Sequence, residues 1–212
     1  MFINQIKFLE NFRCFIKNEV IDFHNQLTII SGDNGSGKSS IVSCIRQEFK
    51  SPWTISDDTQ AKDIIDTSPT HPKNTEISYL CFSGDLLKNA STFDDDMTLH
   101  IKVLGMSSGQ GSLEQLINKV EKSKDKPLLI LDEPERGLSD KRILLIKNYL
   151  TLHLKNNPDQ QVIIITHSKI LMNMATNLYS ASHKEHISVN EYDFWLNNHK
   201  TLSPFAEGVI FN

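Results

Sequence analysis

Residues 27–40 read LTIISGDNGSGKSS, and this stretch decides the fold class. Its first four residues form a largely apolar run with β-branched side chains, which is typical of a strand that is buried on both faces. A glycine-rich loop follows. Apolar residues then recur four apart at Ile41, Ile45 and Phe49, which indicates one face of a helix. The sequence therefore predicts a strand, a tight loop and a helix in immediate succession.

The loop itself, residues 32–39, fits the pattern G-x-x-x-x-G-K-[ST] without a gap. Its glycines let the backbone curl so that successive N–H groups point at an anion, and the positive end of the following helix adds to the attraction. Lys38 would reach the β- and γ-phosphates of a nucleotide, and the hydroxyl of Ser39 would ligate Mg²⁺. A chance match arises on the order of once in 100 chains of this length. We expect the nucleotide to be held by Gly32, Asp33, Asn34, Gly35, Ser36, Gly37, Lys38, Ser39 and Ser40.

A second apolar strand is predicted at residues 128–131, and it ends in Asp132 and Glu133. Because ligands gather at the carboxyl ends of parallel strands, both carboxylates are expected beside the phosphate loop. Asp132 would hold Mg²⁺ through water, and Glu133 would orient or deprotonate the attacking water. The alternative is an ordinary turn after a strand, since Asp, Glu and Pro are common there.

A third apolar strand is predicted at residues 162–165, and His167 follows it closely. A neutral imidazole at this place could donate a hydrogen bond to the γ-phosphate or to the water. Glu133 and His167 are therefore the candidate catalytic residues. The other seven of the eight histidines are expected to be surface residues.

The remaining pattern predicts an α/β protein with a mainly parallel sheet covered by helices on both faces, because apolar strands alternate with helical segments. Alternation at 6–8 and 21–23 indicates two half-exposed strands near the N-terminus, which we expect to form an antiparallel β region. The other expected elements are loops with a short helix at 51–75, a strand at 77–82, helices at 113–120, 143–154 and 170–179, and short strands and turns at 186–212.

Length and composition indicate one globular domain that spans residues 1–212. A net charge of -4 gives no overall sign of nucleic-acid binding. Three cysteines without metal-ligand spacing indicate reduced thiols rather than a disulfide or metal framework. No apolar run approaches the roughly 20 residues that span a bilayer. We therefore expect a soluble, cytoplasmic protein.

Taken in this order, the motifs resemble those of the ABC ATPase family, from about Ile3 to about Leu178. Residues 106–110, MSSGQ, are similar to the family's Leu-Ser-Gly-Gly-Gln signature, within a helical region at about 84–126. In that family the signature opens a helix that contacts the γ-phosphate held by the opposite subunit. The resemblance implies that Ser107 and Gly109, with Ser108 between them, lie at the partner's nucleotide and that Gln110 supports the loop. From the residues alone, a flexible Ser/Gly linker is the alternative.

Two further motifs of the family are present in the chain, and one is missing. Residues 137–140, GLSD, resemble the D-loop of the dimer interface, and Asp140 is also a plausible helix N-cap. His167 matches the switch histidine. The glutamine that the family places after the strand at 77–82 is missing, and Ser83 and Asp85 are the candidates for its place.

The start of the chain points to a branch of the family. Residues 9–15, LENFRCF, resemble the opening Asn-Phe-Arg-x-Phe of RecF, SMC-like and OLD ATPase heads, and Asp132-Glu133-Pro134-Glu135 is closer to that branch than to transporters. The resemblance places Arg13 near the nucleotide, while an exposed strand arginine is the alternative.

This resemblance implies a P-loop NTPase that hydrolyses ATP to ADP and phosphate with Mg²⁺, as a homodimer with two nucleotides between its subunits. The expected task is to control a separate effector protein, such as a nuclease, or to act on nucleic acid in DNA maintenance or anti-phage defence. The alternative is the ATP-binding subunit of an ABC transporter, which the small size favours and the missing glutamine disfavours.

Overall fold

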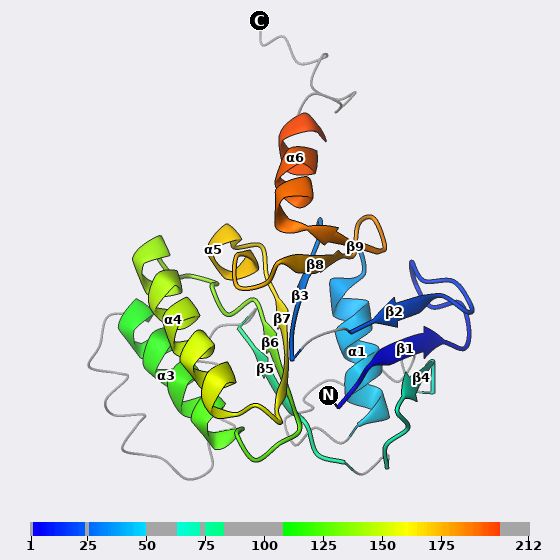
Figure 1. Ribbon diagram of the computed structural model, residues 1–212, viewed down its shortest axis with the longest axis horizontal. Coiled ribbons are helices and arrows are strands. Elements are labelled where there is room, and N and C mark those ends of the chain that lie inside the picture. Colours follow the sequence, from blue (N-terminus) through cyan, green and yellow to red (C-terminus); the bar gives the residue numbers. More distant parts are fainter. Residues whose placement is uncertain (1, 24–25, 50–62, 73–74, 83–107, 200–212) are drawn as a thin grey trace, which may run out of the picture.

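The computed structural model describes residues 2–23, 26–49, 63–72, 75–82 and 108–199 (Figure 1). Its strands form two sheets, and helices pack on both faces of the larger sheet. This confirms the predicted α/β class with a mainly parallel sheet and an antiparallel region near the N-terminus. Of the helical region expected at 84–126, the structure describes residues 108–126. None of the helices in these ranges is long and apolar enough to cross a bilayer.

The larger sheet has six strands in the order β5-β6-β7-β3-β8-β9, and every neighbouring pair except β8 and β9 is parallel. Its three neighbouring strands β6, β7 and β3 are the three apolar runs of the sequence, so the loops that follow them open at one edge. The six strands are β3 (Leu27–Ser31), β5 (Ser78–Cys81), β6 (Leu128–Asp132), β7 (Gln161–Ile165), β8 (Asn177–Ser180) and β9 (Glu185–Ser188).

The smaller sheet is antiparallel, with β1 (Gln5–Phe8) between β2 (Val20–Asp22) and β4 (Ile65–Ser68). Its strands bury alternate residues, as a sheet with one covered face requires. β4 lies within 51–75, where loops and a short helix were expected, so that prediction is wrong at 65–68. The strand is only four residues long and half of it is polar and exposed, which leaves a weak sequence signal.

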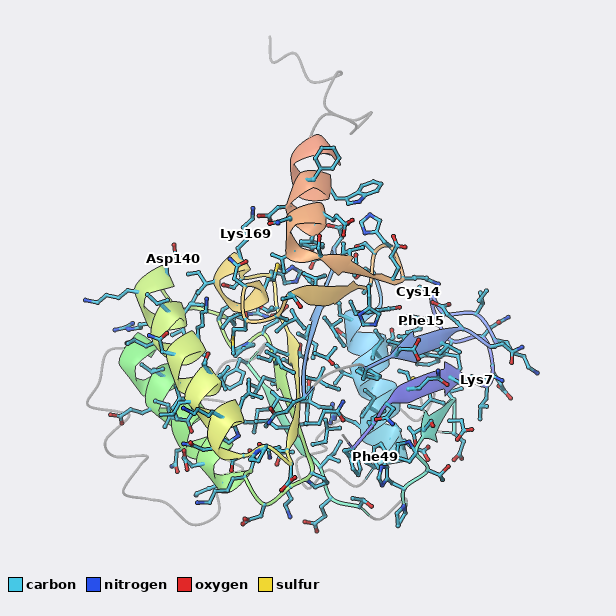
Figure 2. The ribbon with its side chains drawn as sticks, viewed as in Figure 1. Lys7, Cys14, Phe15, Phe49, Asp140 and Lys169 are labelled. Carbon is cyan, nitrogen blue, oxygen red and sulfur yellow. The ribbon has the colours of Figure 1, made fainter. Side chains whose placement is uncertain are left out.

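The helices divide between the two faces of the six-stranded sheet. Helix α1 (Lys38–Glu48) and the smaller sheet pack on one face, where Ile41 and Ile45 meet Ile130 in a single apolar cluster. The other face is covered by α3 (Ser108–Lys122), α4 (Asp140–Asn156) and α5 (Lys169–Met172). Figure 1 shows the two layers, and Figure 2 shows side chains filling the space on both sides of the strands. The predicted helices at 113–120 and 143–154 therefore lie inside α3 and α4.

The C-terminal part differs most from its prediction. The helix expected at 170–179 ends at Met172, and the chain then forms β8, whose Tyr179 pairs with Ile30 of β3. After β9 comes α6 (Val189–His199), which projects from the body in Figure 1 and which the expected strands and turns missed. Its start is a capping box. The backbone N–H of Ser188 donates to Glu191 Oε2 at 2.8 Å, and the N–H of Glu191 donates to Ser188 Oγ at 3.1 Å.

Candidate functional site

The phosphate loop, residues 32–39, joins β3 to α1 at the edge where the parallel strands end. Gly37 has a φ of +105°, a region that side chains rarely adopt. A Cβ atom at Gly37 would lie 2.4 Å from Cys14 Sγ and 2.7 Å from Phe15 Cε2, so the loop has no room for one. The segment after β1 therefore fixes the loop from behind, and the glycine is needed on both counts.

Helix α1 begins at the loop with its N-terminal donors open. Gly37 is the N-cap and supplies no side-chain hydrogen bond. The backbone N–H groups of Lys38 and Ser39 have no acceptor among the described residues. Ser36 Oγ, also in the loop, is buried and has no partner there. Open N–H groups at a helix N-terminus form a site for an anion such as phosphate, so the loop fits the triphosphate of a nucleotide.

The Lys38 side chain lies inside the loop. It is buried, and its Nζ donates to the carbonyl oxygens of Gly32 at 2.7 Å and Asp33 at 2.8 Å. Burial lowers the pKa of Lys38 below its ordinary value, and nearby carboxylates, Glu133 foremost, partly offset this. The ammonium group is thus held among neutral oxygens, which phosphate oxygens could replace with a charge-assisted hydrogen bond.

Asp132 is the last residue of strand β6. Its charge lies close enough to Lys38 to raise the pKa of that ammonium group. Its Oδ2 accepts a hydrogen bond of 2.9 Å from the hydroxyl of Tyr79. Burial raises the pKa of Asp132 above its ordinary value, and the bond from Tyr79 opposes that rise. No group of three or more histidine, cysteine or acidic residues gathers as a ready metal cage in the part of the chain that is described. Asp132 and the exposed Ser39 instead fit Mg²⁺, which is bound in many enzymes by one or two protein oxygens plus phosphates and water.

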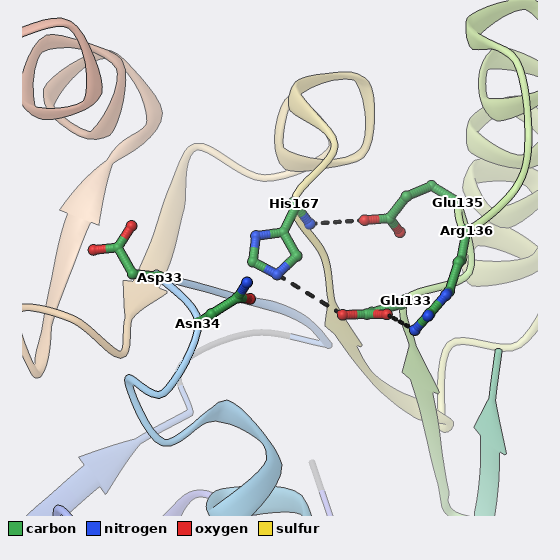
Figure 3. A pocket seen from close by; sticks show the side chains of 6 residues that line it. All are labelled: Asp33, Asn34, Glu133, Glu135, Arg136 and His167. Carbon is green, nitrogen blue, oxygen red and sulfur yellow. Dashed lines mark hydrogen bonds and ion pairs between the residues drawn. The ribbon is translucent and has the colours of Figure 1, made fainter. Parts of the chain in front are cut away.

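Glu133, Arg136 and His167 meet at the end of β6 and β7 (Figure 3). Glu133 Oε2 accepts from Arg136 Nη1 at 3.1 Å, and its Oε1 lies 3.8 Å from His167 Nε2. Glu133 has a φ of 54°, and its N–H donates to the carbonyl of Ile165 at 2.9 Å. One acid is thus bracketed by a guanidinium and an imidazole.

Glu135 holds the segment that carries His167. Its Oε1 accepts from Thr166 Oγ1 and from the backbone N–H of His167, both at 2.7 Å. Its Oε2 is buried and has no partner among the described residues. Figure 3 shows Glu135 on the same wall as Arg136. Because a charged acceptor fixes both donors, the direction of the loop after β7 depends on this carboxylate.

Two adjoining pockets collect these groups. A pocket of about 580 Å³ is lined by Asp33, Asn34, Glu133, Glu135, Arg136 and His167. A second, of about 310 Å³, is lined by Arg13, Cys14, Asn34, Gly35, Gly37, Lys38, Ser39, Ser40 and Glu133. Both contain Asn34 and Glu133, so the phosphate loop and the catalytic candidates open into neighbouring spaces.

Arg13 lies at the second pocket with its Nη1 3.3 Å from Ser40 Oγ, so it is close to the loop rather than remote from it. Sequence reasoning missed Cys14, Glu135 and Arg136 as pocket residues. Arg136 carried a usable signal, since Glu133 and Arg136 have the i, i+3 spacing of a local ion pair. No pattern in the sequence pointed to Cys14.

The C-terminal part of the described chain, from the turn between β8 and β9 to helix α6, also supports the phosphate loop. Ser182, in the turn between β8 and β9, accepts from the backbone N–H of Asp33 at 2.8 Å. Ser31 Oγ donates to the hydroxyl of Tyr192, on α6, at 2.9 Å in a buried position. The phosphate loop is therefore supported from both ends of the described chain.

The signature residues lie elsewhere. Ser107 is outside the described residues, as are Ser83 and Asp85, while Ser108, Gly109 and Gln110 form the start of α3. α3 and α1 cover opposite faces of the sheet, so the helix that begins with these residues packs on the face away from the helix that follows the phosphate loop. In the D-loop segment the N-cap of α4 is Ser139, so the N-cap prediction for Asp140 is wrong by one residue.

Comparison with known proteins gives the family and the fold. The AAA domain family model matches residues 8–177, while no curated protein gives a significant match. An SMC head bound to the C-winged helix domain of ScpA has a TM-score of 0.61 at 14% identity, over 90% of this chain and 99% of that chain. The cbiO1 protein from Clostridium perfringens, part of the ABC transporter complex cbiONQ, has a TM-score of 0.58 at 15% identity, over 96% and 97%.

The SMC head domain from Thermotoga maritima has a TM-score of 0.56 at 16% identity, over 84% of this chain and 94% of that chain. Similarity at such identities establishes a shared fold. The match to the family model, by contrast, spans most of the sequence. The chain therefore belongs to the AAA domain family, and its fold is the one shared by ABC-type ATP-binding cassettes and SMC heads.

Proposed function

We propose that this chain is an ATPase of the ABC type that binds ATP with Mg²⁺ at residues 32–40 and hydrolyses it to ADP and phosphate. The observation that carries the proposal is the convergence of two sets of groups on Asn34 and Glu133. Lys38 and the open donors of α1 belong to one pocket and His167 to the other, while Asn34 and Glu133 line both. Phosphate binding and water activation both need this combination.

Each residue has a role in this mechanism. Lys38 would donate to the β- and γ-phosphate oxygens, and the N–H groups of the loop would hold the remaining charge. Ser39 and Asp132 would hold Mg²⁺, which neutralises phosphate charge when bound. Glu133 would accept the proton of the attacking water, with His167 donating to the γ-phosphate or the water. Arg13 would lie at the nucleotide beside Ser40.

The second half of the site would come from another copy of the chain. The separation of α1 and α3 onto opposite faces supports this, because the signature helix does not share a packed face with the helix that follows the phosphate loop of its own chain. Residues 107–110 of a second copy would close over the γ-phosphate, and ATP would bridge two subunits. A higher affinity of ATP for the closed pair than for the open one would make the assembly a switch.

The experiment uses two variants. Glu133→Gln is expected to lower the hydrolysis rate about 100-fold or more, the usual contribution of a general base, and to trap an ATP-bound dimer on gel filtration. Lys38→Ala is expected to weaken ATP binding roughly 10- to 100-fold, as the loss of a charge-assisted bond implies. A Glu133→Gln protein that stays monomeric at saturating ATP would refute the dimer mechanism.

For the biological role, we propose a head that controls a separate effector protein, such as a nuclease, or that acts on nucleic acid, in DNA maintenance or prokaryotic anti-phage defence in the cytoplasm. The Asn-Phe-Arg-x-Phe segment at 11–15 and the fold shared with SMC heads support this branch. Stimulation of ATP hydrolysis by DNA would support direct action on nucleic acid. Recovery of a soluble partner from native lysate would support effector control.

The second candidate is the ATP-binding subunit of a transporter. The observation that favours it is the match to cbiO1 over nearly the whole of both chains. The absence of the family's glutamine after β5 argues against it, since residue 83 is serine and residue 85 is aspartate. Co-purification with a membrane permease would select this candidate over the first.

A further inference from the structure

Tyr79 connects strand β5 to the metal carboxylate of the proposed site. Its hydroxyl donates to Asp132 Oδ2 at 2.9 Å. β5 and β6 are parallel, with Cys81 opposite Asp132. Because Tyr79 is two residues before Cys81, its side chain lies on the same face of the sheet as Asp132, which is the face that α1 covers. Tyr79 therefore reaches Asp132 from the side of the phosphate loop.

The tyrosine ring is itself held in place. The guanidinium of Arg46, in the last turn of α1, lies 4.1 Å from the ring centroid. A carboxylate only accepts hydrogen bonds, so the tyrosine hydroxyl is the donor in this pair. A ring held in place by Arg46 with its donor aimed at Asp132 constrains the orientation of the carboxylate that accepts from it.

Such a constraint matters at a metal carboxylate. A carboxylate that holds a metal, directly or through water, does so more tightly when an outer hydrogen bond fixes its orientation than when it is free to rotate. We propose that Tyr79 is a positioning residue whose hydroxyl fixes the orientation in which Asp132 meets the Mg²⁺ of a bound nucleotide. This inference rests on the proposed function and adds to it a residue from β5.

The chain offers a matched control in Tyr149. Its hydroxyl donates to Glu121 Oε1 at 2.7 Å, an exposed bond between α4 and α3 on the other face of the sheet. Tyr79→Phe and Tyr149→Phe therefore delete the same atom from the same kind of bond. Only the first of these bonds involves a residue of the proposed metal site.

The experiment measures binding rather than activity. The dissociation constant of a non-hydrolysable ATP analogue is determined by calorimetry once with Mg²⁺ and once with EDTA, and the ratio of the two values reports the metal's contribution. Tyr79→Phe is expected to reduce this ratio about 10-fold, the lower range for lost outer-sphere partners of metal ligands. Its affinity in EDTA, and both affinities of Tyr149→Phe, are expected to match the wild type.

A double-mutant cycle then tests the route of the effect. In an Asp132→Asn background, Tyr79→Phe is expected to cause no further loss, because the carboxylate it positions is gone. Arg46→Met, which releases the ring but keeps the hydroxyl, is expected to reduce the ratio by a smaller factor, and it replaces Tyr79→Phe if that variant does not fold.

Three results would overturn the inference: an unchanged ratio in Tyr79→Phe, or in Arg46→Met where that variant takes its place; an equal loss with Mg²⁺ and with EDTA; or additive losses in the double variant. A wild-type protein that fails to bind the analogue would instead refute the proposed function.

Discussion

The contact between Gly37 and the segment behind it can be tested by adding one methyl group. Gly37→Ala places a Cβ 2.4 Å from Cys14 Sγ and 2.7 Å from Phe15 Cε2, at a φ of +105°. The left-handed backbone costs about 1 kcal/mol for alanine, and overpacking against a fixed neighbour adds about 1 to 3 kcal/mol. We expect the free energy of unfolding to fall by about 2 to 4 kcal/mol, a large part of a typical total.

Gly35→Ala separates the two contributions. Gly35 has a φ of +83°, and a Cβ atom added there would have nothing within 4 Å, so only the backbone cost of about 1 kcal/mol applies. Urea unfolding followed by far-ultraviolet circular dichroism should place the midpoint of Gly37→Ala about 1 M below that of Gly35→Ala. Adding Cys14→Ala to Gly37→Ala should recover part of the loss. Equal midpoints for the two glycine variants would refute the claim that this segment supports the loop.

Three other substitutions test the surroundings of the loop. Burial raises the pKa of Asp132, so the stability that this group contributes is present below its ordinary pKa and is lost as pH rises through the raised value. Asp132→Asn should therefore raise the nucleotide-free unfolding free energy at neutral pH and not in acid. Glu135→Ala removes the acceptor of the His167 N–H and should cost about 2 to 3 kcal/mol in urea unfolding. Tyr192→Phe removes the buried bond from Ser31 and should cost about 1 kcal/mol by the same measurement.

Exposed bonds of the same chemistry provide the controls for the last two variants. Glu121→Ala and Tyr149→Phe both break the exposed bond between α3 and α4, and Tyr149→Phe also removes a long bond of 3.4 Å to the carbonyl of Ile117. Each should change stability by less than about 0.5 kcal/mol. A Glu135→Ala protein as stable as Glu121→Ala would show that the loop after β7 does not depend on Glu135. Likewise, a Tyr192→Phe protein with the same free energy of unfolding as the wild type would mean that α6 does not support the phosphate loop.

The core of the fold could be predicted because its signals are local. Strands β3, β6 and β7 are largely apolar runs, and each is followed closely by its polar site residues. The start of α6 also carried a signal in the spacing of Ser188 and Glu191, which form the capping box seen in the structure. A capping box predicts a helix only when a periodic apolar face follows it, and the tail lacks a clear one.

The rest depended on contacts between distant segments. Residues 170–179 have helix-like apolar spacing, yet pairing of Tyr179 with Ile30 makes the end of that segment a strand. At this place, hydrogen bonding to the edge of β3 outweighed the local helix propensity. Similarly, Lys38 and Asp132 were recognisable from their motifs, while the bond from Tyr79 to Asp132 joins residues 53 positions apart and has no sequence signature.

The left-handed backbone of Glu133 has a consequence for how this protein can evolve. A φ of 54° is unfavourable for a long side chain and costs about 1 kcal/mol, whereas glycine adopts it freely. Mutation of this residue to glycine would thus relieve the backbone strain and raise the free energy of unfolding. It would also remove the acid proposed to activate water. A descendant released from selection for turnover should therefore lose that acid early, with a melting temperature at most about 2 to 4 °C higher, and would bind nucleotide without hydrolysing it.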